Sequence, residues 1–375
     1  AKRRAYTLAD NKLALNATWD DELLRVELTE LSFDETLNFD AFGFSQSELD
    51  KILSSAQPTT DEEIDDVNPQ VPRQPVSQPG DIWDMGEHKL ICGDSTDPAV
   101  VARVLNGSRP TLLFTSPPYG QQRDYTVGID DWTSLMEGVF GASLPVMADA
   151  GQVLVNLGLI HRDGEWVQYW TGWMEWMRSA GWKKFGLYVW DQGPGLPGDW
   201  GGRLAPAFEF VFHFNRSSRK PNKIVEAKNA GQLLAGTGLR GADGKLHKKT
   251  GHGKPIQDMK IPDSVIRIMR HHGKIEAGAH PAVMAVKLPR FVIETFTDLG
   301  ETILEPFCGS GSTILAGEQT GRVVRAVELA PEYVDVAVMR WNTVFPDMPA
   351  TMRGKTLGAL ARERGCADDV GGRGK

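Results

Sequence analysis

The chain has 375 residues, of which 41% are hydrophobic and 24% are charged, a balance typical of a globular protein of two or three domains. It has no apolar run of about 18 residues and no apolar core near residue 1, so we expect neither a membrane span nor a signal peptide. The three cysteines are far apart, which argues against a disulfide framework and favours a reducing compartment such as the cytoplasm. The histidines lack the spacing of metal ligands, which argues against a metal site.

The net charge of −8 is unevenly distributed along the chain. Residues 1–66 hold 16 acidic and 6 basic residues, whereas residues 213–260 hold 11 basic and 3 acidic ones. Because the positive charge is concentrated in one segment, an acidic protein of this kind can still bind a polyanion. A solvated loop without a partner is the alternative interpretation of that segment.

The N-terminal part of the chain is expected to form a separate unit. Residues 1–56 have apolar spacings that predict short helices, and Ser45 with Glu48 forms a capping box at the start of one of them. Residues 57–80 contain five prolines and an acidic run, which predict a semi-extended linker with little to bury.

Residues 81–350 alternate short apolar strands with amphipathic helices. Strands are expected at 88–93, 111–115, 152–157, 184–190, 207–214, 301–305 and 323–328. Helices are expected at 131–149, 165–180, 287–299, 312–320 and 331–343. This alternation predicts an α/β fold with a mostly parallel, doubly wound, Rossmann-like sheet covered by helices on both faces. The stretch 213–262 interrupts the alternation and predicts an irregular basic insert, and residues 351–375 are expected to form a C-terminal tail.

Seven of the eleven tryptophans fall between residues 166 and 200. Trp166, Trp170 and Trp173 have the spacing of one helical face. We interpret them as a stripe that faces the core, with a platform for stacking bases as the alternative.

Directly after the strand at 111–115 comes Ser116-Pro117-Pro118-Tyr119. Two prolines with fixed φ and no N–H predict a rigid turn at the carboxyl end of a strand, where parallel sheets bind ligands. The Tyr119 ring can stack on a planar substrate, while the Ser116 hydroxyl and the Pro117 carbonyl can accept hydrogen bonds from an amino group. An ordinary proline turn is the alternative interpretation.

A glycine-containing turn links the strand at 301–305 to the next helix. Gly309 and Gly311 allow a tight turn and a close approach of the backbone to a ligand at a helix N-terminus. Glu328, at the end of the following strand and about 20 residues later, is placed to bind ribose hydroxyls. The turn lacks the Gly-Lys-Ser/Thr of a P-loop and the glycine spacing of a dinucleotide-binding loop.

The two turns, in this order, resemble the catalytic and cofactor motifs of the DNA amino-methyltransferases that use S-adenosylmethionine (AdoMet). Residues 88–95 (HKLICGDS), 280–296 (HPAVMAVKLPRFVIETF) and 331–341 (PEYVDVAVMRW) resemble three further segments of the group in which the catalytic motif comes first. The resemblance covers residues 81–345 and implies a methyltransferase sheet with AdoMet as its cofactor.

The resemblance also implies roles for individual residues. Ser116, Pro117, Pro118 and Tyr119 would form the catalytic motif, whereas Cys308 would only pack. The cofactor-binding residues that it implies are Asp94, Thr115, His280, Pro281, Ala282, Glu305, Pro306, Phe307, Gly309, Ser310, Gly311, Ser312 and Glu328.

The implied reaction methylates an exocyclic amino group of a base that is flipped out of double-stranded DNA. Serine at the first catalytic position favours N4 of cytosine, and N6 of adenine is the alternative; a catalytically inactive DNA-binding or partition-type module is an alternative of another class. The basic segment would then read the target and contact phosphates through Arg216, Arg219, Lys220, Lys223, Lys245, Lys248 and Lys249.

The stretch RRAYTLADNKLALNATWDDELLRVELTEL is similar to the tail of the ParB-like domain that often precedes such methyltransferases in phage and prophage proteins. The upstream nucleotide-pocket motif of that domain is absent from the sequence, so no ParB activity is implied. We expect the protein to work in the cytoplasm of a bacterial or phage-infected cell, with restriction-modification, phage protection and regulation as open roles.

Overall fold

The structure is a computed structural model that describes residues 61–119, 129–195, 198, 200–234, 245, 253–270 and 284–366. Several sequence predictions lie outside the described residues: the helical unit at 1–56, the His280-Pro281-Ala282 segment, and the contacts of Lys248 and Lys249. Among the described residues, no helix is long and apolar enough to cross a lipid bilayer.

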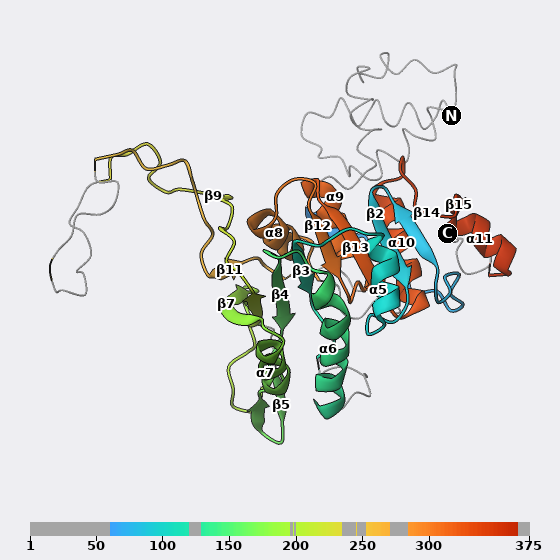
Figure 1. The fold of residues 1–375 in the computed structure, drawn as a ribbon, viewed down its shortest axis with the longest axis horizontal. Coiled ribbons are helices and arrows are strands. Elements are labelled where there is room, and N and C mark those ends of the chain that lie inside the picture. The colour runs from blue at the N-terminus through green and yellow to red at the C-terminus, as the bar shows by residue number, and fades with distance from the viewer. Residues whose placement is uncertain are drawn as a thin grey trace, which may run out of the picture.

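Strands from most of the described chain join one mixed sheet (Figure 1). Its order is β11 (Val265–Arg267), β7 (Lys183–Asp191), β8 (Phe208–Asn215), β4 (Gln152–Leu157), β3 (Leu112–Thr115), β12 (Thr302–Glu305), β13 (Val323–Glu328), β2 (His88–Cys92), β1 (Ile82–Met85), β14 (Thr351–Met352) and β15 (Lys355–Thr356). The five central strands β4, β3, β12, β13 and β2 run parallel, whereas β8 pairs antiparallel with β4 and β7. The predicted α/β fold with a largely parallel centre is confirmed.

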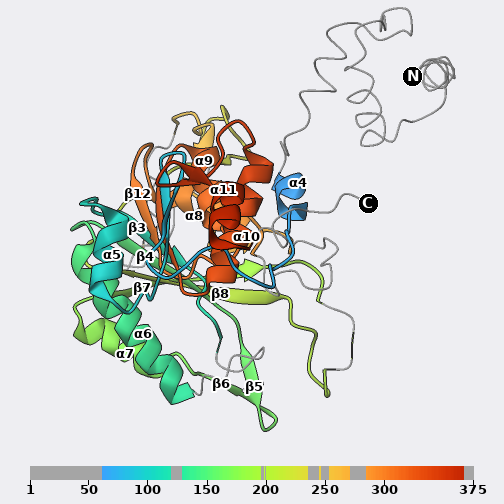
Figure 2. The same cartoon turned by 90° about the vertical axis from the view of Figure 1, so that its right-hand side faces the viewer.

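Helices cover both faces of this sheet (Figure 2). One face carries α5 (Pro98–Leu105), α6 (Ile129–Ser143) and α7 (Thr171–Ser179). The other face carries α8 (Lys287–Phe296), α9 (Ser312–Thr320) and α10 (Pro331–Val344). Neighbouring strand residues divide between the two cores: Leu113 and Leu304 pack with the first set, whereas Phe114 and Ile303 pack with the second. Burial on both faces explains why the central strands read as continuous apolar runs.

The smaller elements are α4 (Asp61–Asp66), the 3-10 turn η2 (Leu144–Val146) and α11 (Leu357–Arg364). There are also two small antiparallel pairs: the hairpin of β5 (Ile160–Arg162) with β6 (Glu165–Val167), and the ladder of β9 (Val225–Glu226) with β10 (Met259–Lys260). Two of these smaller elements correct the helix predictions. The helix expected over 165–180 begins only at Thr171, because residues 165–167 pair with 160–162 as a hairpin. The helix expected over 131–149 ends at Ser143, where Pro145 follows and cannot continue it.

The described parts of the expected linker and tail, residues 61–80 and 351–366, pack on the domain. Residues 61–66 form α4, and Ile64 and Val76 are buried in the core on the side of α10, so the segment 57–80 is not wholly extended. Residues 351–364 are not a tail, since they form β14, β15 and α11, with Leu357 and Leu360 buried. Apolar residues spaced along these short segments reach the core only through long-range packing, which local periodicity does not reveal.

The expected basic insert begins later than predicted. Residues 213–215 belong to β8, where His213 and Asn215 are each 1% exposed. The described residues 216–234, 245 and 253–260 are called the basic arm below. Residues 216–222 still pack on the domain, where Gln152 of β4 donates to the Ser217 carbonyl and the Asn222 N–H donates to the Thr295 carbonyl. The part that carries the short β9–β10 ladder extends away from the sheet (Figure 1).

Candidate active site

The parallel strands bring their carboxyl ends to one edge of the sheet. Thr115 ends β3, Glu305 ends β12 and Glu328 ends β13, while Asp94 follows β2. The two turns found in the sequence, Ser116–Tyr119 and Phe307–Ser312, both start at this edge. In a parallel sheet this edge is where ligands bind, so the structure brings the two turns together as predicted.

The Ser116 hydroxyl is oriented by a neighbouring strand. Its Oγ donates to Oδ1 of Asn156 at 3.1 Å, and the Asn156 side chain is itself fixed because its Nδ2 donates to the Phe210 carbonyl at 3.2 Å. With its proton directed at Asn156, the Ser116 oxygen keeps its lone pairs for a donor in the substrate.

Tyr119 is held by a carboxylate on β8. Its hydroxyl donates to Oε2 of Glu209 at 2.7 Å and lies 3.4 Å from the Ser116 Oγ. Burial, followed by the charge of Glu209, raises the pKa of Tyr119 well above its ordinary value, so the phenol stays protonated. Gly158 provides room for the ring, because a Cβ there would lie 2.8 Å from Tyr119 Cε2.

The two prolines place their carbonyls differently. The Pro118 carbonyl accepts a hydrogen bond of 2.7 Å from Nε1 of Trp132 on α6. No donor among the described residues binds the Pro117 carbonyl, which therefore retains its capacity to accept.

The glycine turn is closed by Glu328. Gly309 and Gly311 have φ of 54° and 85°, the left-handed region that favours glycine. Oε2 of Glu328 accepts from the Gly309 N–H at 2.7 Å, and its Oε1 accepts from the Ala330 N–H at 3.0 Å. Each carboxylate oxygen has a second lone pair, so Glu328 can also accept from ribose hydroxyls. A backbone turn at the start of α9 beside this carboxylate fits the ribose-bearing part of AdoMet.

A buried carboxyl group links the two turns. Glu305 is 1% exposed and accepts hydrogen bonds from the hydroxyls of Thr115 and Thr313 and from the Phe307 N–H. Burial raises its pKa to about 8 despite these three donors. Thr115 is fully buried and directly precedes the catalytic turn, so its hydrogen bond to Glu305 connects that turn to the strand that leads into the glycine turn.

The other predicted cofactor residues lie around the same edge. Asp94 is exposed, and its Oδ1 accepts from the N–H and hydroxyl of Thr96, both at 2.8 Å. The side chains of Ser310 and Ser312 are buried and bind Arg340, so they face away from the open side of the turn. Cys308 is buried, and burial raises the pKa of its thiol well above the ordinary value, as suits a packing residue.

Four residues of the site were not predicted from the sequence: Asn156, Glu209, Trp132 and Arg340. Asn156 is the polar residue near the end of the apolar strand QVLVNL, and Glu209 is the acidic residue within FEFVFHFN. A polar side chain in an otherwise apolar strand is the signal that could have found both.

The predicted DNA contacts divide into two groups. Arg219 forms ion pairs with Asp298 at 2.8 Å and Glu301 at 2.7 Å, and its side chain is 17% exposed. Its charge is therefore compensated within the fold, which argues against the predicted phosphate contact. The remaining predicted residues that the structure describes are exposed on the basic arm: Arg216, Lys220, Lys223 and Lys245.

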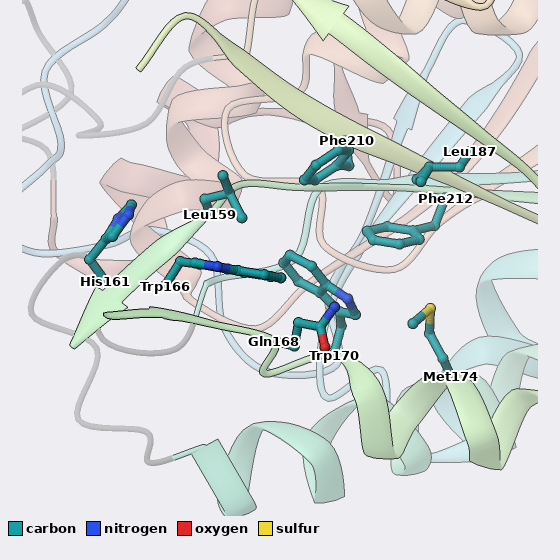
Figure 3. Close-up of a pocket in the computed structure, with 9 residues that line it drawn as sticks. All are labelled: Leu159, His161, Trp166, Gln168, Trp170, Met174, Leu187, Phe210 and Phe212. Atoms are coloured by element: carbon teal, nitrogen blue, oxygen red, sulfur yellow. The ribbon is translucent and has the colours of Figure 1, made fainter. Parts of the chain in front are cut away.

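The tryptophan stripe is only partly a core feature. Trp170 and Trp173 are buried, but Trp166 lies on β6 and is 55% exposed. Trp166 and Trp170 line a pocket of about 460 Å³ together with Phe210 and Phe212 of β8, next to the β5–β6 hairpin (Figure 3). The prediction that all three tryptophans face the core was wrong for Trp166, because the helix begins at Thr171 and does not include residue 166.

Comparison with known proteins gives two family matches. A model described as a DNA methylase, of the N6/N4 type, matches residues 111–339, and a ParB-methyltransferase HTH domain matches residues 22–79. The second match extends through most of the expected linker.

Curated relatives and solved structures agree with the first match. The type II methyltransferase M.Cfr9I of Citrobacter freundii is 24% identical over 289 residues, 64% of this chain and 84% of the relative. M.XycI of Xanthomonas campestris pv. cyanopsidis is 24% identical over 65% of this chain and 85% of the relative. The PvuII DNA methyltransferase, titled cytosine-N4-specific, superposes with a TM-score of 0.51 at 16% identity over 79% of this chain and 96% of its own, which shows a shared fold.

Proposed function

This chain belongs to the N6/N4 DNA methylase family, and we propose that it methylates N4 of a cytosine that is flipped out of double-stranded DNA into the space beside Ser116 and Tyr119. The observation that carries this proposal is the oriented Ser116 hydroxyl, which stands at the carboxyl edge next to the glycine turn. The family acts on amino groups of DNA bases, and the choice of cytosine rests on serine at the first catalytic position.

AdoMet supplies the methyl group when it is bound. Of the residues at the edge, the backbone of the glycine turn would lie against it, Glu328 would hold its ribose hydroxyls and Asp94 would lie near its adenine. The side chains of Glu305 and Thr115 would keep this turn in register with the catalytic turn, since they bind each other beneath it.

The catalytic turn acts on the amino group of the base. That nitrogen is a poor nucleophile because its lone pair is delocalised into the ring. The Ser116 Oγ and the Pro117 carbonyl can accept its two hydrogens, which favours a pyramidal nitrogen and stabilises the positive charge that develops on it. Tyr119 would stack on the base. If the Ser116 hydroxyl turns its proton from Asn156 to the Tyr119 oxygen, 3.4 Å away, the proton that leaves the amino group has a route through Ser116 and Tyr119 to the Glu209 carboxylate.

DNA would be held by the basic arm, whose exposed cations can neutralise phosphates. The proposal includes flipping of the base, since an amino group that is paired and stacked inside a duplex is not accessible to the catalytic turn. We place the protein in the cytoplasm, where its DNA substrate would be found.

The test is to incubate the purified chain with AdoMet and unmodified DNA and to digest the DNA for nucleoside mass spectrometry. We expect N4-methylcytosine, and far less of it in the same reaction time with the Ser116→Ala variant. N6-methyladenine would assign the alternative base. AdoMet binding without any methylated nucleoside would contradict the proposal and favour an inactive DNA-binding module.

A further inference from the structure

The buried side chain of Arg340 on α10 joins the glycine turn to the segment that matches the ParB-methyltransferase HTH domain. That match covers residues 22–79, and its described part, residues 61–79, contacts α10 at two separate points. One contact involves Arg340 and the other involves Asp335.

At the first contact, Arg340 holds the HTH-matched segment with one end of its guanidinium. The residue is 0% exposed. Its Nη2 donates to the Ile64 carbonyl at 3.1 Å and lies 3.5 Å from Oδ1 of Asp65. The same Asp65 oxygen accepts from the Val286 N–H at 2.8 Å, just before α8. Asp65, 5% exposed, is the one ion-pair partner of Arg340 within the described residues.

The other end of the guanidinium holds the glycine turn. Nη1 of Arg340 donates to Oγ of Ser312 at 2.8 Å and to Oγ of Ser310 at 3.2 Å. Gly311, between these serines, sits directly on α10, because a Cβ at this position would lie 3.2 Å from the Cβ of Ala337. One buried cation therefore spans from the HTH-matched segment to both sides of Gly311.

The second contact has no link to the turn. Asp335 accepts from the Val76 N–H at 2.5 Å and from the Ser77 N–H at 3.0 Å, and the Ser77 hydroxyl also donates to it. It is a buried carboxylate on the same helix that binds the same segment, so it provides a matched control for Asp65.

A buried guanidinium without a carboxylate partner is strongly unfavourable, and removing one partner of such a pair destabilises the arrangement around the other. Burial lowers the pKa of Arg340 to about 10, and the charge of Asp65 opposes this shift. Loss of the Asp65 charge should therefore disturb the groups that Arg340 binds, which are the two serines of the glycine turn.

We propose that Asp65 and Arg340 are positioning residues for AdoMet, through which the HTH-matched segment orders the glycine turn. The inference rests on the proposed function in placing AdoMet at this turn. Coupling of this kind is reciprocal: a partner that moves the segment changes the affinity for AdoMet, and AdoMet changes the affinity for that partner by the same factor.

The test compares Asp65→Asn with Asp335→Asn in the full chain, with AdoMet affinity measured by isothermal titration calorimetry. Asparagine at position 65 still accepts from the Val286 N–H but lacks the charge. We expect the AdoMet Kd of Asp65→Asn to rise about tenfold, within the usual range of coupling between sites, and that of Asp335→Asn to stay near the wild-type value. Both variants should melt at a lower temperature, because Asp65→Asn leaves the buried Arg340 without its ion-pair partner and Asp335→Asn weakens the buried hydrogen bonds to Val76 and Ser77.

Steady-state kinetics provide a second readout. Asp65→Asn should raise the KM for AdoMet while kcat at saturating AdoMet is kept, as expected for a residue that touches neither substrate. Arg340→Lys keeps the charge, but one ammonium cannot reach both sides, so it should weaken AdoMet as well even if Asp65→Asn fails to fold. Wild-type AdoMet affinity in folded Asp65→Asn or Arg340→Lys, or equal weakening in Asp335→Asn, would overturn the inference. A wild-type chain that does not bind AdoMet would instead overturn the proposed function.

Discussion

The carboxyl edge of the sheet and the basic arm hold their polar side chains in opposite ways. At the edge, Ser116, Tyr119 and Glu305 are bonded to neighbouring side chains, so their atoms have fixed positions. On the arm, the exposed Lys220 offers charge rather than a fixed geometry. Variants at the edge should therefore change turnover and AdoMet affinity, whereas variants on the arm should change DNA affinity in a salt-dependent way.

The largest effect is expected for Ser116→Ala. It removes an acceptor that is used mainly as charge develops on the amino nitrogen, so kcat should fall about 10²- to 10³-fold. The AdoMet Kd should stay near the wild-type value, because Ser116 lies on the other turn. Single-turnover methylation and calorimetry measure the two quantities, and an equal loss of both would show a structural role for Ser116.

Gly311→Val should act on the cofactor instead. Gly311 has φ of 85° and faces the Cβ of Ala337, so a branched side chain is both strained and crowded. We expect the AdoMet Kd to rise about ten- to a hundredfold, the scale of strain at a left-handed residue. Gly358→Ala, within α11 and away from the edge, is a folding control that should bind AdoMet as the wild type does. Normal AdoMet binding by Gly311→Val would contradict the assigned role of the turn.

Glu305→Gln tests the link between the two turns through pH. The pKa of Glu305 is raised to about 8 from an ordinary 4.5, so between these values the native state holds a proton that the unfolded chain releases. The free energy of unfolding should therefore decrease as the pH rises through this window. Glutamine does not titrate, so in the variant the slope of the unfolding free energy against pH should be smaller by up to about 1.4 kcal/mol per pH unit. Urea unfolding at pH 5 to 8 measures the slope, which must differ between the two proteins.

The smallest effects are expected on the basic arm, where two neighbouring residues should differ in their effect on DNA affinity. Lys220→Ala should reduce the slope of log DNA affinity against log salt by about 0.9, the value for one lost phosphate contact. The neighbouring Arg219→Ala should leave that slope unchanged but lower the melting temperature, because Arg219 is already paired with Asp298 and Glu301. Fluorescence anisotropy at several salt concentrations distinguishes them, and the opposite pattern would assign the DNA-facing charge to Arg219.

The sequence by itself determined the parallel centre of the sheet and the place of both turns. Strands such as β4 are buried along their whole length, so their apolar runs predict a strand without any knowledge of the neighbouring strands. The two turns are also local features, because proline and glycine act through their own backbone angles.

Only the tertiary structure decided which polar side chains meet. The Tyr119–Glu209 bond spans 90 residues, the Arg219–Glu301 bond spans 82, and the contact of Arg340 with Asp65 spans 275. Such pairs depend on which strands and helices become neighbours, so Glu209 appears in the sequence only as an acidic residue in a strand and Arg219 only as a basic one in a loop. Trp166 shows the same dependence, since its exposure follows from pairing of β6 with β5 rather than from its spacing to Trp170.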